Sequence, residues 1–170
     1  RFINQYHDEA GYIAALASSI REHWQENGRG DHLLLSFHGV PQYTLDGGDP
    51  YHCHCQKTGR LLAEALDLGE DDWTLSFQSR VGREEWLKPY TDATVRELGK
   101  SGVKSLDVAC PGFSTDCLET LEEIAMQNAD FFTEAGGGSL NYVPALNARD
   151  DHIGVLSELI RTHMAGWRTT

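Results

Sequence analysis

One short apolar run that ends in a histidine constrains the fold of this chain more than any other feature. Residues 33–37 hold four bulky apolar side chains and one serine, and His38, Gly39 and Pro41 follow at once. Hydrophobicity that is continuous rather than alternating is typical of a parallel strand covered on both faces. Open parallel sheets bind ligands outside the carboxyl ends of their strands. We therefore predict that His38 lies at a functional edge of such a sheet.

The composition limits the classes of protein to which this chain can belong. It has 170 residues, of which 40% are hydrophobic and 24% charged, enough for one globular domain with a core. The formal net charge of -12 argues against nucleic acid as a partner, because phosphate-backbone binding needs basic patches. It also disfavours a polybasic membrane anchor, although peripheral membrane contact stays open.

The chain shows no signal peptide and no apolar run of the roughly 20 residues that cross a bilayer. We therefore predict a cytoplasmic protein without a transmembrane segment. The first residue is Arg1 rather than Met, within a segment whose periodicity predicts a helix. We expect the chain to be part of a longer polypeptide.

Strand patterns and helix patterns alternate along the sequence, which predicts an α/β fold. We expect an open parallel sheet of four strands flanked by helices, a Rossmann-like lobe preceded by a long helix. The predicted strands are residues 33–37, 73–78, 105–109 and 140–143, and the predicted helices are 2–26, 52–66, 91–100, 115–134 and 149–165. In domain terms, residues 1–28 form a connecting amphipathic helix and residues 29–166 the α/β lobe.

Three of the four predicted strands run into polar loops. Ser36 and His38 end the first, residues 77–80 end the second, and residues 110–116 follow the third. The carboxyl ends of parallel strands meet at one edge of the sheet, so these loops are expected to converge. The prediction of a functional site here depends on all three loops meeting at one edge, because one polar loop alone is weak evidence for a site.

An acidic stripe follows the third strand. Glu119 and Glu123 are four residues apart and share one face of the predicted helix, and Asp116 extends that face. Paired carboxylates can bind metal ions and transfer protons. Two other interpretations stay open: Asp116 can cap the helix, and the stripe can be an ordinary solvated surface.

His38 and Glu119 together suggest a site for a metal ion and protons. A neutral imidazole binds a metal or accepts a proton near pH 7. An imidazole and a carboxylate on opposite walls of a cleft suit Fe(II) or another first-row divalent ion. The alternative for His38 is a hydrogen bond to the backbone.

Aromatic and basic side chains in the same loops could hold an organic ligand. Trp86 and Phe113 add flat apolar surface, and Arg80 could meet an anionic group. Core packing of the aromatic rings and solvation of the arginine are the alternatives.

The cysteines do not match a standard zinc spacing. Nothing in the sequence indicates secretion, so reduced thiols are expected. The ordinary interpretation is that they are small buried residues, while a four-cysteine iron–sulfur site stays open. The four are Cys53, Cys55, Cys110 and Cys117.

Several motifs together resemble the ferrochelatase family, more narrowly the C-terminal half of a proteobacterial protoporphyrin ferrochelatase. They agree in order and spacing, and the resemblance extends to about residue 159. The motifs are SFHGVP at 36–41, GDPY at 48–51, FQSRVG at 77–82, WL at 86–87, PYTD at 89–92 and CPGFSTDCLETLEE at 110–123.

The resemblance implies insertion of Fe(II) into protoporphyrin IX to form haem b, with iron as substrate and no organic cofactor. It also implies two similar lobes around a porphyrin cleft, of which this chain is the second and the N-terminal lobe is absent. His38 and Glu119 match the iron-site residues of the family, and Asp116 and Glu123 match further acidic positions. Ser79, Trp86 and Phe113 match cleft positions, and Arg80 lies beside them.

The sequence departs from the family pattern at Cys117, where many members have histidine. The cysteines of the animal-type [2Fe-2S] cluster lie outside the matching region, so the resemblance does not support such a cluster. An internal cluster of the four cysteines stays open.

Two other functions also stay open: a related cobalt or nickel chelatase for another tetrapyrrole, and a non-catalytic module that binds tetrapyrrole or metal. We expect the chain alone to be inactive.

Overall fold

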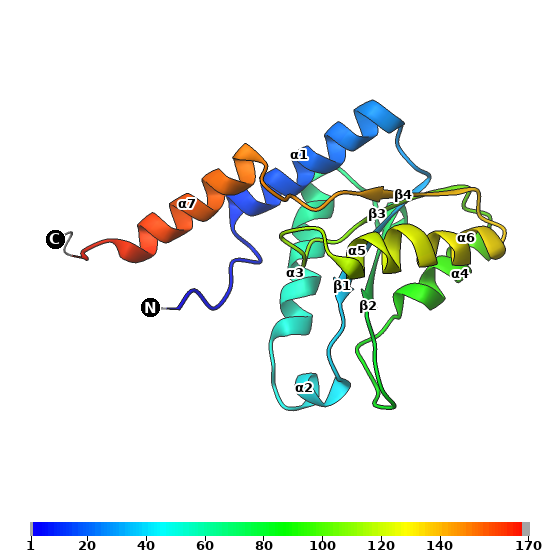
Figure 1. Ribbon diagram of the computed structural model, residues 1–170, viewed down its shortest axis with the longest axis horizontal. Helices are drawn as coiled ribbons and strands as arrows, with labels where there is room; N and C mark the ends of the chain where they lie inside the picture. The colour runs from blue at the N-terminus through cyan, green and yellow to red at the C-terminus, as the bar shows by residue number, and fades with distance from the viewer. Residues whose placement is uncertain (1, 168–170) are drawn as a thin grey trace.

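The structure, a computed structural model, describes residues 2–167 and has a parallel sheet at its centre (Figure 1). The four strands found in this part of the chain are β1 (His32–His38), β2 (Trp73–Gln78), β3 (Ser105–Ala109) and β4 (Ser139–Val143). Their spatial order is β2-β1-β3-β4, and all neighbours are parallel. Leu35 of β1 pairs in register with Leu75 of β2 and with Ala109 of β3. The predicted α/β class and the four parallel strands are confirmed.

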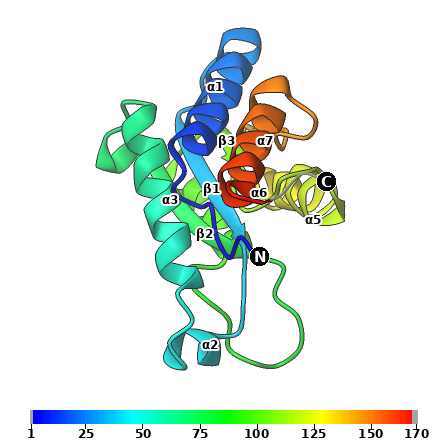
Figure 2. The ribbon, with the colours of Figure 1, turned by 90° about the vertical axis from the view of Figure 1, so that its left-hand side faces the viewer.

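Helices cover both faces of the sheet. Helices α1 and α3 lie against one face, and α4 and α6 against the other (Figures 1 and 2). The helices are α1 (Ala10–Asn27), α2 (Gln42–Asp46), α3 (Tyr51–Ala65), α4 (Thr91–Ser101), α5 (Leu118–Leu121), α6 (Ala129–Glu134) and α7 (Asp150–Met164), with a 3-10 turn η1 (Glu70–Asp72) and a π-helical segment η2 (Glu123–Asn128).

The alternation of side chains along β1 divides the core in two. Leu33, Leu35 and Phe37 point into a cluster with α1 and α3, which also holds Tyr12 of α1. Leu34 points the other way, into a cluster built largely from β3, α4 and the η2–α6 region. Both faces of the strand are therefore apolar, which explains the continuous hydrophobic run in the sequence.

The first helix begins later than predicted. Residues 2–9 were expected to be helical, but α1 begins at Ala10 and Phe2 is 94% exposed. Contacts with α3 hold the preceding residues in another conformation: the Thr58 hydroxyl donates to the carbonyl of His7 (2.8 Å), and Lys57 pairs with Asp8 (2.5 Å). The helical spacing of apolar residues gave a wrong prediction for this segment, because its conformation depends on Lys57 and Thr58, which lie far from it in the sequence.

The predicted helix 115–134 is also not continuous. It divides into α5, the π-helical η2 and α6, and its first helical residue is Leu118. In η2 the Asn128 side chain donates to the carbonyl of Glu123 (2.8 Å), five residues back. A π-helical turn inserts an extra residue and so changes the direction in which neighbouring side chains point.

Helices α1 and α7 pack side by side (Figures 1 and 2). Among residues 2–167, no helix is both long and apolar enough to cross a lipid bilayer.

Candidate functional site

The strand order creates a crevice at the carboxyl edge of the sheet. The connection from β1 leads to β2 on one side, whereas β3 lies on the other side of β1. Such a reversal of strand order opens a binding crevice outside the strand ends. A cavity of about 430 Å³ lies at this edge. It is lined by His38, Ser79, Arg80, Val81, Trp86, Glu119, Glu122, Glu123 and Gln127.

His38 is the last residue of β1 and lines this cavity, as predicted. Its Nδ1 lies 2.6 Å from the carbonyl oxygen of Gly39, which can only accept, so Nδ1 carries the proton. In the neutral ring, Nε2 then has a free lone pair for a metal ion or a proton. The Tyr51 hydroxyl donates to the His38 carbonyl (2.9 Å) and fixes the backbone beneath the ring.

Glu119 lines the same cavity from α5. A hydrogen bond from the Cys117 thiol, together with a backbone hydrogen bond and the proximity of His38, lowers the pKa of Glu119 below its ordinary value. Burial and the neighbouring Glu119 carboxyl raise the pKa of Cys117. The site therefore holds an ionised carboxylate beside a protonated thiol and an imidazole. The predicted proximity of His38 and Glu119 is present.

Glu123 is fixed by the end of β2. The backbone N–H of Ser79 donates to one carboxylate oxygen (2.7 Å) and the Ser79 hydroxyl to the other (2.6 Å). Ser79 adopts φ = 64°, a left-handed conformation that is uncommon for residues other than glycine. Both of its donors thereby reach one carboxylate, and Glu123 forms a second acidic position beyond Glu119.

A buried polar network under the cavity escaped the sequence analysis. The Gln78 side chain accepts from the Ser36 hydroxyl (2.8 Å) and donates to the carbonyl of Glu119 (2.6 Å). The Thr91 hydroxyl lies 2.8 Å from those of both Ser36 and Ser76. Polar residues inside predicted strands were the signal that could have revealed this network, since such groups need partners when buried.

Trp86 and Phe113 flank His38, with ring centroids 6.4 Å and 6.1 Å from the imidazole. Trp86 is 8% exposed and donates its indole N–H to the carbonyl of Val81 (3.0 Å). The absence of a side chain at Gly39 is required here: a Cβ would lie 3.2 Å from the Trp86 ring and 2.9 Å from the carbonyl oxygen of Gln78. Trp86 thus serves both packing and the cavity wall, whereas Phe113 lies beside His38 but is not among the residues that line the cavity.

Arg80 borders the cavity but has partners of its own. Its guanidinium pairs with Asp92 (2.7 Å) and lies 4.2 Å from the centroid of the Tyr90 ring. Its side chain is half exposed, so an anionic ligand could compete for it.

Asp116 is not among the residues that line the His38 cavity. Its carboxylate accepts hydrogen bonds from the Tyr142 hydroxyl (2.7 Å), the Asn147 side chain (2.7 Å), the Ala145 N–H (3.2 Å) and the Thr120 hydroxyl (3.3 Å). Burial raises the pKa of Asp116, but these hydrogen bonds outweigh it, so the pKa lies below its ordinary value. The N-cap of α5 is Cys117, not Asp116.

The four cysteines are free thiols in different environments. Cys53 is exposed and Cys117 partly buried, whereas Cys55 and Cys110 are buried. Burial raises the pKa of Cys55 to about 12 and that of Cys110 well above its ordinary value. Within residues 2–167, no group of three or more His, Cys, Asp or Glu side chains is placed to hold a metal ion.

Comparison with known proteins identifies the family. The family model described as "Ferrochelatase" matches residues 1–164. The chain is 59% identical to a ferrochelatase of Teredinibacter turnerae and 56% identical to ferrochelatases of Thioalkalivibrio sulfidiphilus and Chromobacterium violaceum. Each match covers 98% of this chain but only 45–46% of the relative, so the chain spans less than half the length of these curated proteins. Because the family model matches nearly the whole chain, the chain belongs to the ferrochelatase family.

Proposed function

We propose that the protein inserts Fe(II) into protoporphyrin IX to form haem b, the last step of haem synthesis. The observation that carries this proposal is the placement of His38 and Glu119 in one cavity flanked by Trp86 and Phe113. An imidazole, an ionised carboxylate and flat aromatic walls are the groups that metallation of a porphyrin requires. Membership of the ferrochelatase family supports the same reaction.

The reaction exchanges two protons for one metal ion. Two pyrrole N–H bonds break, their electron pairs bind Fe(II), and two protons leave. His38 is suited to accept a proton through Nε2, because Nδ1 is occupied by the Gly39 carbonyl. Glu119 and Glu123, both lining the cavity, can carry protons away or present the ferrous substrate. Both roles start from an ionised carboxylate, and the hydrogen bond from Cys117 favours this form of Glu119 by lowering its pKa.

The porphyrin would lie against Trp86 and Phe113, with Ser79 and Arg80 at its margin. Macrocycle distortion that turns the nitrogen lone pairs toward the metal would favour the transition state over the flat substrate. Arg80 could exchange its contact with Asp92 for an acidic substituent of the porphyrin.

The second wall of the cleft would come from the part of the family's length that this chain does not cover. The cavity at His38 is open on one side of a single lobe, and the chain spans less than half of its relatives. We therefore propose an N-terminal lobe as the partner of this one, a chain that is inactive alone, and a cytoplasmic enzyme that uses no organic cofactor.

The decisive test is an anaerobic haem-formation assay with Fe(II) and protoporphyrin IX. It would compare the intact polypeptide, its His38→Ala variant and the 170-residue chain. Activity of the intact protein that is lost in His38→Ala, with an unchanged circular dichroism spectrum, would support the proposal. Turnover only with Co(II) or Ni(II) and another tetrapyrrole would indicate a sister chelatase instead. Porphyrin binding without turnover would indicate a non-catalytic module.

A further inference from the structure

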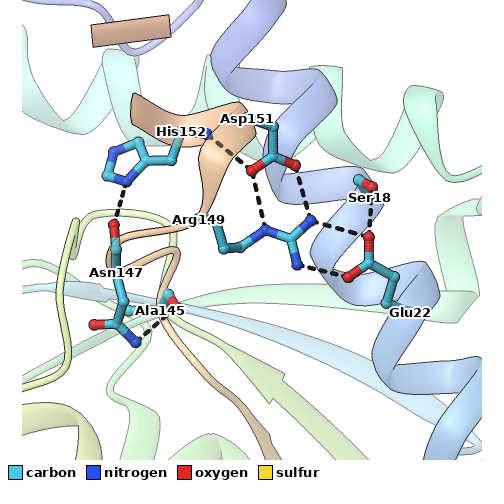
Figure 3. Close-up of polar contacts among 7 residues, drawn as sticks. All are labelled: Ser18, Glu22, Ala145, Asn147, Arg149, Asp151 and His152. Atoms are coloured by element: carbon cyan, nitrogen blue, oxygen red, sulfur yellow. Dashed lines mark hydrogen bonds and ion pairs between the residues drawn. The ribbon is translucent and has the colours of Figure 1, made fainter. Parts of the chain in front are cut away.

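The loop between β4 and α7 holds an asparagine with an unusual number of contacts. Asn147 adopts φ = 48°, in the left-handed region. Its backbone N–H donates to the carbonyl of Ser114 (2.9 Å), and its side chain donates to the carbonyl of Ala145 (3.1 Å; Figure 3). Asn is one of the few residues that tolerate this conformation, and here the conformation directs its amide toward the loop that follows β3.

The Asn147 side chain binds Asp116 at two points. The side-chain oxygen of Asn147 accepts a hydrogen bond from the Asp116 backbone N–H (2.9 Å). The side-chain NH₂ of Asn147 donates to an Asp116 carboxylate oxygen (2.7 Å). The two bonds run in opposite directions, so they fix both the position and the orientation of Asp116.

The other end of Asn147 is attached to a rigid part of the lobe. The backbone carbonyl of Asn147 accepts a hydrogen bond from Nδ1 of His152 (2.8 Å; Figure 3). His152 belongs to α7 and is only 2% exposed. Two residues along, Arg149 forms a double hydrogen bond with Glu22 of α1 (2.6 and 2.9 Å) and also contacts Asp151. The loop is thus held between α1 and α7 and can act as a fixed support.

Asp116 transmits this support to the acidic residues. Its carboxylate accepts from Thr120, whose hydroxyl oxygen in turn accepts from the N–H of Cys117 (3.0 Å). Cys117 and Thr120 bracket Glu119 in the first turn of α5. Three donors meet one oxygen of the Asp116 carboxylate and Asn147 meets the other, so this carboxylate is directed at the surrounding loops, and it does not line the His38 cavity.

We propose that Asn147 is a positioning residue that, through Asp116, holds the first turn of α5 and so aims Glu119 at His38. In this arrangement the Asp116 carboxylate orients the loop and does not contact the reacting atoms. The inference deepens the proposed function and rests on it for its kinetic readout.

The test uses the intact polypeptide with Asn147→Asp and the double variant Asn147→Asp/Asp116→Asn. The single variant sets two carboxylates against each other. The double variant again pairs one amide with one carboxylate, but the amide is now at position 116 and the carboxylate at position 147. The side-chain NH₂ of residue 116 can then donate a hydrogen bond to the carboxylate of residue 147. Asp67→Asn is the matched control, because Asp67 is an exposed left-handed residue (φ = 55°) in the turn after α3, outside the residues that line the His38 cavity.

Iron-insertion kinetics and amide hydrogen exchange of residues 116–121 are the two readouts. We expect Asn147→Asp to lower kcat about 10- to 100-fold, as small misplacements of catalytic groups do, with the KM for porphyrin within about twofold of wild type. The exchanged pair should recover most of kcat and of the amide protection, and the control should match wild type. If Asn147→Asp does not fold, Asn147→Gly tests the same loss, since glycine keeps the left-handed backbone.

Two results would overturn the inference: wild-type kcat in Asn147→Asp, or an exchanged pair as slow as the single variant, which would mean that the Asp116 carboxylate itself is needed. An inactive wild-type protein would refute the proposed function instead. In that case amide exchange alone decides: protection at 116–121 that does not respond to Asn147→Asp would refute the positioning role.

Discussion

Ser79 gives both of its hydrogen-bond donors to one carboxylate, that of Glu123, at 2.7 Å and 2.6 Å. The two residues are 44 positions apart, one after β2 and the other at the start of η2. The contact fixes the π-helical segment against the sheet edge. It also requires the left-handed backbone at Ser79, so a single position serves both geometry and hydrogen bonding.

Replacing Ser79 separates these two roles. Ser79→Ala and Ser79→Gly both lose the hydroxyl contact, and we expect kcat for iron insertion to fall about tenfold in each. Glycine tolerates the positive φ, so Ser79→Gly should be about 1 kcal/mol more stable than Ser79→Ala. Thermal unfolding beside kinetics checks this, and an alanine variant as stable as the glycine variant would disprove the backbone argument.

Gly39→Ala should be destabilising. The new Cβ would lie 2.9 Å from the Gln78 carbonyl oxygen and 3.2 Å from the Trp86 ring, and overpacking of this kind costs about 1–3 kcal/mol. Displacement of Trp86 should also weaken porphyrin binding, measured by fluorescence quenching.

Gly154→Ala in α7 is the control for this prediction. Nothing lies within 4 Å of the Cβ position at Gly154, and alanine there should stabilise the helix by about 0.5–1 kcal/mol. Equal stability of the two variants would contradict the close approach at Gly39.

Cys117→Ala should raise the pKa of Glu119 toward its ordinary value of 4.5, because the variant removes the thiol hydrogen bond that is the main cause of the lowering. A lowered carboxyl pKa stabilises the fold above the unfolded-state pKa, and this stabilisation is lost as pH falls through the folded-state pKa. In Cys117→Ala, the Glu119 carboxylate should therefore become protonated at a higher pH than in the wild type, and its contribution to stability should be lost at that higher pH. A carboxyl ¹³C titration of Glu119 measures the midpoint, with the exposed Cys53→Ala as control; an unchanged midpoint would exclude the thiol as the cause.

Asp107 should be essential for stability. It is 1% exposed in β3 and accepts from the Trp24 indole (2.7 Å), the Gly30 N–H (2.7 Å) and the Asn141 side chain (3.0 Å). Asp107→Leu leaves three donors without their acceptor, and we expect a loss of about 3–5 kcal/mol in urea unfolding. The exposed Asp71→Asn serves as control, and a loss in Asp107→Leu no larger than in this control would refute the expectation.

The sheet could be predicted from sequence because its signal is local. The predicted strands 73–78 and 105–109 coincide with β2 and β3, and 33–37 differs from β1 by one residue at each end. Residues 33–37 form a nearly continuous apolar run, which is typical of a strand buried on both faces. Residues 73–78 and 105–109 hold large apolar residues at alternate positions, which is the other pattern that predicts a strand. The location of His38 followed from the same reasoning.

What could not be predicted depends on contacts between distant segments. The start of α1 is decided by the contact of His7 with α3, and the start of the π-helical segment is held by the contact of Glu123 with Ser79, 44 positions away. Asn147 stands in an ordinary polar loop, and its partner Asp116 is 31 residues away. Periodicity and propensity describe neighbours along the chain, so they do not carry this information.

The hydroxyl and amide groups of Ser36, Ser76, Gln78 and Thr91 join the ends of β1 and β2 to the start of α4 beneath the cavity. Hydrogen bonds are directional, and these are buried, where water cannot replace them. The floor of the cleft is thus preorganised when the protein folds. The entropy lost in ordering it is spent once, during folding, and is not repeated each time a substrate enters or a product leaves.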